Sequence, residues 1–76
     1  MVRTVFYAGE LRDNEGNFWA KIDKDGDIHD SSGKKIGRIN NAGYIYDTDD
    51  KKVAKVDSSS IVRNLFGHKI GSYKYL

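Results

Sequence analysis

The sequence predicts an all-β protein of four and a half tandem β-hairpin repeats, about nine short strands, in a closed or radial pseudo-symmetric meander without a helix. Two observations lead to this prediction. The same residue types recur every 17 residues along the 76-residue chain, and all eight glycines fall on positions of the repeat. Apolar residues also alternate over short segments, whereas no segment has the i, i+3, i+4, i+7 spacing of an amphipathic helix.

The repeat divides a single domain, residues 1–76, into one half repeat and four whole repeats. The half repeat is predicted for residues 1–8, and the whole repeats for 9–25, 26–42, 43–59 and 60–76. Each whole repeat opens with glycine or serine and has aspartate or asparagine four residues later. These two columns are Gly9, Gly26, Gly43 and Ser60, and Asp13, Asp30, Asp47 and Asn64.

An Asp-x-x-Gly step in each repeat predicts a tight turn between its two strands. Aspartate or asparagine at the first position accepts a hydrogen bond from the backbone two residues on, and glycine supplies the positive φ that ends the turn. Asp50 replaces this glycine in the third repeat, and aspartate tolerates that conformation better than most residues. The polar segments 23–26, 40–43 and 57–60 predict a second turn between successive repeats.

The second strand of each repeat has an irregular apolar spacing. Ile36 and Ile39 are three residues apart, so a flat strand would send them to opposite faces. Gly37 between them lets the backbone bend or approach a neighbour closely. Its equivalents are also small, namely Ala20, Ala54 and Gly71. We expect the strands to converge here around a central axis. The column before these residues, Trp19, Ile36, Val53 and Ile70, is predicted to pack in the core.

The ends of the meander are expected to approach one another, because an open nine-stranded sheet would expose two edges that invite aggregation. The segment 26–39, GDIHDSSGKKIGRI, carries the glycine-punctuated hairpin pattern, which extends over nearly the whole chain. This pattern resembles the four-fold and five-fold β-flowers, small bacterial and phage-associated proteins with tandem β-hairpins around a pseudo-symmetry axis. The resemblance implies a fold and no assigned activity, so it assigns no functional residues.

Composition limits the classes of function. Cysteine is absent, which excludes disulfides and cysteine-based zinc sites, and the net charge of +2 comes from interspersed charges of both signs. The first eight residues lack an apolar signal core, and no segment is long and apolar enough for a membrane span. We therefore expect a cytoplasmic protein without a membrane partner.

No arrangement of residues at a recognisable spacing predicts catalysis. The acidic segment 23–30 lacks the spacing of an EF-hand loop, so we interpret its aspartates as turn residues and predict no metal. His29 and His68 occupy non-equivalent repeat positions, and Ser58, Ser59 and Ser60 have no base nearby in the sequence. The chain is therefore predicted to be neither an enzyme nor a cofactor-binding protein.

Basic residues recur in the second strands and support one hypothesis of function. Aligned in rings or a stripe, they would attract an anionic ligand such as a nucleotide or nucleic acid. The candidate residues for this alternative are Lys35, Arg38, Lys52, Lys55 and Lys69. The same lysines also suit a solvated surface that keeps β-edges apart.

Departures from the repeat support the preferred hypothesis, a module that binds another protein or copies of itself. Large apolar residues replace polar ones late in the chain, and two of them fall in the last hairpin turn. The candidate interface residues are Tyr44, Tyr46, Ile61, Leu65 and Phe66. Apolar residues in a turn imply contact with the N-terminal strand of the same chain, an interface with another molecule, or a small-molecule pocket. The sequence leaves these three open.

Overall fold

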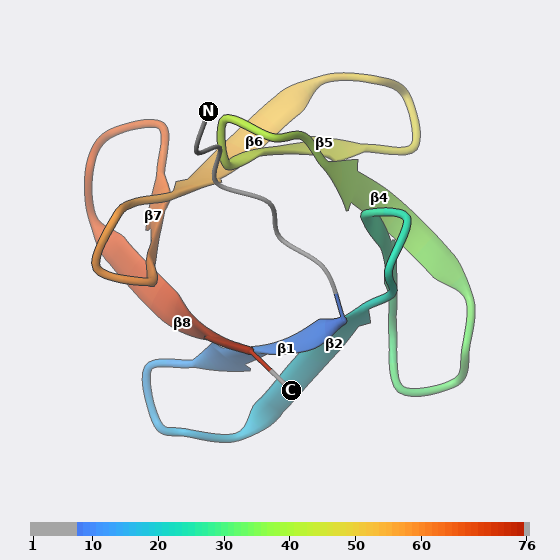
Figure 1. Cartoon of the computed structure of the whole chain (residues 1–76). Coiled ribbons are helices and arrows are strands. Elements are labelled where there is room, and N and C mark those ends of the chain that lie inside the picture. The colour runs from blue at the N-terminus through green and yellow to red at the C-terminus, as the bar shows by residue number, and fades with distance from the viewer. Residues whose placement is uncertain (1–7, 76) are drawn as a thin grey trace, which may run out of the picture.

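The computed structural model describes residues 8–75, in which eight strands form one closed antiparallel barrel (Figure 1). The strands are β1 (Gly9–Asp13), β2 (Phe18–Ile22), β3 (Asp27–His29), β4 (Lys35–Ile39), β5 (Tyr44–Asp47), β6 (Lys52–Val56), β7 (Ile61–Asn64) and β8 (Lys69–Tyr75). Each strand pairs with its sequence neighbours, and β1 also pairs with β8. The predicted all-β meander is confirmed, with eight strands instead of about nine. Residues 1–7 of the predicted half repeat lie outside the described residues.

Four hairpin turns, within segments 14–17, 31–34, 48–51 and 65–68, lie at one end of the barrel, which we call the hairpin end. Figure 1 shows these loops radiating outward from the ring. In every turn a side-chain oxygen accepts hydrogen bonds from the backbone N–H groups two and four residues later, at 2.9–3.1 Å. The accepting residues are Asp13, Asp30, Asp47 and Asn64. Positive φ follows at Gly16, Gly33, Asp50 and Gly67, as the sequence predicts.

Three connections between the repeats lie at the opposite end, which we call the connection end. They repeat the same turn chemistry, because Asp23, Asn40 and Asp57 each accept two backbone N–H bonds at 2.9–3.0 Å. Each turn then closes on a residue with positive φ, including Ser60 at 65°. A single local motif therefore makes all seven connections of the described barrel.

A β-bulge interrupts the pairing of every hairpin near the hairpin end. In the first hairpin Leu11 pairs with Ala20 and Arg12 pairs with Phe18, so Trp19 has no partner in the register. The pairing register of the other three hairpins shifts at the equivalent position. The four residues passed over are Trp19, Ile36, Val53 and Ile70. The bend predicted from the spacing of Ile36 and Ile39 is thus a bulge that occurs once per repeat.

The core fills the barrel with apolar side chains from both strands of the repeats. Its buried members are Leu11, Ala20, Ile22, Ile28, Ile39, Ile45, Ala54, Val56 and Val62. A Cβ on Gly37 would overlap the backbone carbonyl oxygen of Tyr46, and one on Gly71 would overlap that of Arg12. The small column therefore allows the close approach of neighbouring strands that the sequence predicts.

The barrel closes between its first and last strands. Five residue pairs join them, from Gly9 opposite Tyr75 to Asp13 opposite Gly71. Beyond the strands, the Asn14 side-chain amide donates a hydrogen bond to the Lys69 carbonyl at 2.9 Å. The predicted approach of the two ends is confirmed, and it removes both sheet edges from solvent.

Candidate functional site: an apolar pocket at the hairpin end

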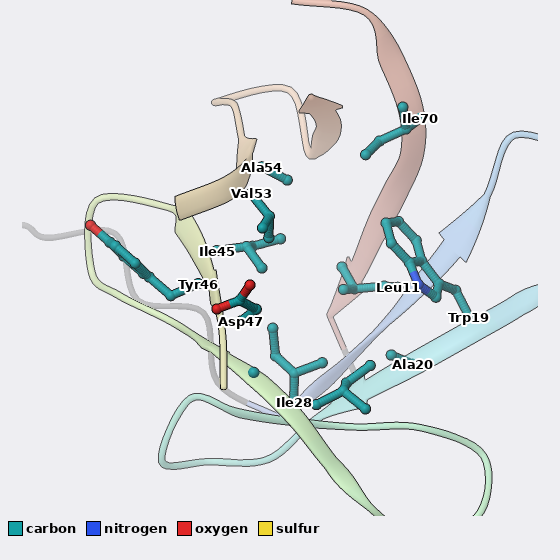
Figure 2. A pocket seen from close by; sticks show the side chains of 12 residues that line it. Leu11, Trp19, Ala20, Ile28, Ile45, Tyr46, Asp47, Val53, Ala54 and Ile70 are labelled. Carbon is teal, nitrogen blue, oxygen red and sulfur yellow. The ribbon is translucent and has the colours of Figure 1, made fainter. Parts of the chain in front are cut away.

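An apolar pocket of about 190 Å³ lies on the barrel axis at the hairpin end (Figure 2). The bulged residue of every repeat lines it, namely Trp19, Ile36, Val53 and Ile70. Leu11, Ile28 and Ile45, from the first strands of three repeats, form its buried floor. Figure 2 shows Trp19 from β2, Ile70 from β8 and Val53 from β6 around this space. The pocket is therefore a product of the repeat.

The bulge explains how the pocket forms. Trp19 and Ala20 are consecutive, yet both line the pocket, as do Val53 and Ala54. A regular strand would place consecutive side chains on opposite faces. The extra residue instead adds a layer of apolar side chains above the packed core.

Two of these residues, Trp19 and Val53, differ from the sequence prediction in their exposure, whereas Ile36 and Ile70 pack against the core. The prediction placed their column in the core, whereas Trp19 remains 36% exposed and Val53 42%. The small residue after each of them was the available signal, because a bulge next to it turns both positions inward. Sequence reasoning did not extend this signal to a pocket.

The pocket wall is almost entirely carbon. Among the described residues that line it, Asp47 is the one acidic or basic residue. Its Oδ1 already accepts hydrogen bonds from the backbone N–H groups of Asp49 and Lys51, at 2.9 and 3.0 Å. This geometry suits burial of an apolar group and provides no general acid and base pair.

Two of the predicted interface residues lie under cationic side chains. The Lys52 ammonium is 4.0 Å from the centroid of the Tyr44 ring, and that of Lys55 is 5.1 Å away. The Arg38 guanidinium carbon is 4.5 Å from the Tyr46 ring centroid. Both tyrosines are half-buried in β5. Predicted interface and anion-binding residues therefore contact each other here through cation–π interactions.

The other predicted interface residues lie apart from this group. Ile61 is half-buried at the start of β7. Leu65 and Phe66 occupy the hairpin turn between β7 and β8, where they are 58% and 85% exposed. Contact between this turn and the predicted N-terminal strand involves residues outside the described range. The structure thus divides the predicted set into three parts: the two tyrosines of β5, Ile61 in β7, and the exposed turn.

The predicted anion-binding residues are distributed around the barrel. They lie on β4, β6 and β8, which are separated by intervening strands in the closed order. The Lys35 ammonium is 3.1 Å from the Asp27 carboxylate, and Arg38 forms an ion pair with Asp50. Lys69 is exposed at the start of β8. The predicted cations form a discontinuous ring, and four of the five contact a partner within the chain.

The acidic segment 23–30 serves the turns, as predicted. Besides its backbone bonds, Asp23 has an Oδ2 that lies 3.2 Å from His29 Nε2. Asp30 accepts a hydrogen bond from the Ser32 hydroxyl at 2.7 Å, and this bond and its backbone bonds hold the pKa of Asp30 below its usual value. Within residues 8–75, no three His, Asp or Glu side chains are placed to hold a metal ion.

No protein-family model, curated protein or solved structure matches the chain. The closed hairpin barrel is compatible with the repeat fold that the β-flower resemblance implies. None of the described residues forms a helix that could span a membrane.

Proposed function

We propose that the chain is a non-enzymatic β-repeat module that works through protein contacts, in the first place with copies of itself. The observation that carries this proposal is the exposed pair Leu65 and Phe66 in the turn between β7 and β8. Large apolar side chains exposed together mark an interaction surface more often than isolated ones do.

The turn itself does not require apolar side chains at these positions. Its conformation depends on Asn64, which accepts the N–H bonds of Phe66 and His68, and on Gly67 with its positive φ. The three equivalent turns have the same construction with polar residues instead, the pairs Asn14 and Glu15, Ser31 and Ser32, and Thr48 and Asp49. The fold does not explain why Leu65 and Phe66 are apolar, whereas contact with a partner does.

The size of the surface predicts weak association. Burying a leucine or phenylalanine side chain contributes about 1.5–3 kcal/mol, whereas association costs roughly 4–15 kcal/mol in lost freedom. Two such residues from each of two copies contribute about 6–12 kcal/mol, which only offsets this cost. The assembly should therefore form only at high protein concentration.

The test is the solution mass of the wild type and of the Leu65→Ser, Phe66→Ser double variant over a wide concentration range. We expect the wild-type mass to rise above that of the monomer, while the variant stays monomeric with an unchanged melting temperature. The matched control is Thr48→Ser, Asp49→Ser in the equivalent turn, which should associate like the wild type.

Two outcomes would contradict the proposal. A wild type that is monomeric at every concentration would exclude self-association. A double variant that unfolds, while the control remains folded, would show that Leu65 and Phe66 stabilise the chain itself.

Anion binding by Lys35, Arg38, Lys52, Lys55 and Lys69 remains the alternative. It predicts measurable affinity for an oligonucleotide at low salt, and this affinity should fall as salt rises. Negligible binding at low salt would exclude it.

A further inference from the structure

We propose that the axial pocket at the hairpin end binds one small, uncharged aromatic molecule. This inference is independent of the proposed self-association, because Leu65 and Phe66 are not among the residues that line the pocket. It rests on the size, the lining and the buried floor of the pocket.

The pocket has the size of a single-ring ligand. Its volume is about 190 Å³. An apolar cavity of about 150 Å³ lined by leucine, isoleucine and phenylalanine stays dry and binds benzene. The present pocket is therefore large enough for one aromatic ring with a short substituent, and below the roughly 300–1,000 Å³ that larger ligands require.

The lining selects for an uncharged ligand. Trp19, Val53 and Ile70 present carbon surfaces, and the Oδ1 atom of Asp47 is already hydrogen-bonded to two backbone N–H groups. An anionic ligand would lose its hydration without a cationic partner in the wall, and it would face the Asp47 carboxylate. A cationic ligand would lose its hydration for one carboxylate, whose Oδ1 is already hydrogen-bonded. The Trp19 indole adds an aromatic surface, against which an edge or an offset face of a ring packs favourably.

The floor selects for a short ligand. Leu11, Ile28 and Ile45 are almost completely buried beneath the pocket, so a long alkyl chain could not extend along the barrel axis. Trp19 and Val53 line the pocket and remain partly exposed, so its solvent-facing side includes them. A ligand can therefore enter from solvent at the hairpin end.

Phe66 of the same chain does not line the pocket. Phe66 is the most exposed large apolar residue of the described range. It lies on a hairpin loop that radiates away from the barrel axis in Figure 1, and the pocket lies on that axis (Figure 2).

The test uses toluene as the probe and Trp19 as the reporter, because Trp19 is the only tryptophan in the chain. Toluene should change the Trp19 emission saturably, and its own NMR signals should broaden in the presence of the protein. Benzoate, a charged compound of similar size, should bind at least tenfold more weakly.

Two variants and one control test whether toluene binds in the axial pocket. Ala54→Leu fills the pocket from its wall, and Val53→Lys places a charge at the open side, where a folded strand tolerates it. Each should weaken toluene binding at least tenfold. The Leu65→Ser, Phe66→Ser double variant, which is monomeric under the proposed function, should bind toluene within twofold of the wild type.

Several results would overturn the inference. These are the absence of saturable toluene binding, equal binding of benzoate, or unchanged binding by the folded Val53→Lys variant. If Trp19 emission changed with protein concentration and not with added toluene, the occupant of the pocket would be a second copy of the chain. Because mass is measured separately from toluene binding, failure of this inference is distinguishable from failure of self-association.

Discussion

The two ends of the barrel come from the same repeat, yet one is packed and the other is open. At the connection end Ile22, Ile39 and Val56 are buried in the core. At the hairpin end Trp19 and Val53 are partly exposed around a pocket. One extra residue in each hairpin accounts for the difference, because the bulge adds an apolar layer that no further layer covers. The same repeat thus supplies a packed core at one end and an apolar pocket at the other.

The largest expected effect is a difference in stability when isoleucine is replaced by alanine at each end of the barrel. Ile22→Ala at the connection end should lower the free energy of unfolding by about 2–5 kcal/mol, because it leaves a cavity in a closed core. Ile36→Ala at the pocket should cost roughly 1 kcal/mol, because a half-buried side chain loses fewer contacts and leaves no closed cavity. Urea unfolding of both variants measures the difference.

A marginal domain of this size could unfold outright in the Ile22→Ala variant. Ile22→Val, which should cost about 0.5–1.5 kcal/mol, then replaces it, with Ile36→Val as its matched control. Equal costs at the two ends would mean that the hairpin end is packed as tightly as the connection end.

The second prediction concerns Gly37, which directly follows the bulged Ile36. Gly37→Ala should destabilise the protein by roughly 1–3 kcal/mol, because the new methyl group would overlap the Tyr46 carbonyl oxygen and force β4 away from β5. Ala54→Gly, the reverse change in the same column, should cost about 0.5–1 kcal/mol through chain entropy. Thermal or urea unfolding measures both.

The stability of Gly37→Ala shows whether the small residues at this repeat position are needed for close strand approach. A Gly37→Ala variant as stable as the wild type would show that close strand approach is not needed beside the bulge. The pocket would then owe its shape to the bulged side chains alone.

The features that could be predicted from the sequence are those determined by short segments. The turn at Asp47 and its positive φ at Asp50 follow from side-chain hydrogen bonds within four residues. Closure of the barrel was predictable from the cost of free edges. The eight strands found correspond to the whole repeats, since residues 1–7 of the half repeat lie outside the described range.

The pocket and the pairing of the surface charges depend on contacts between distant segments. Whether Trp19 faces the core or a pocket depends on the cross-strand register at Leu11 and Arg12 and on the residues that three other hairpins bring to the axis. The Arg38 and Asp50 ion pair similarly depends on how β4 lies beside the next hairpin. Neither follows from a 17-residue pattern considered on its own.

The smallest expected effect is on the pH dependence of stability, and it is tested with one aspartate from each end of the barrel. The backbone N–H of Ile61 and the Arg63 side chain hold the pKa of Asp57, at the connection end, below its usual value of 3.8. The Ser32 hydroxyl does the same for the pKa of Asp30, at the hairpin end. Because both pKa values are lower in the folded state, the resulting stability is present above about pH 4 and is lost as the pH falls below 3.8.

Substitution by asparagine tests this comparison with a residue that the chain already uses at equivalent turns, Asn40 and Asn64. Asp57→Asn and Asp30→Asn retain the Oδ1 acceptor for the backbone N–H groups and lose the titrating charge, and Asp57→Asn also loses the ion pair with Arg63. Each should lower the melting temperature slightly at pH 7, where the charge contributes stability, and flatten its decline between pH 4 and pH 2. Asp57→Asn should flatten it more, because Asp57 also loses a charged partner, Arg63, at 3.0 Å. Equal acid profiles for both variants would mean that the turn hydrogen bonds alone, at either end, determine the pH dependence.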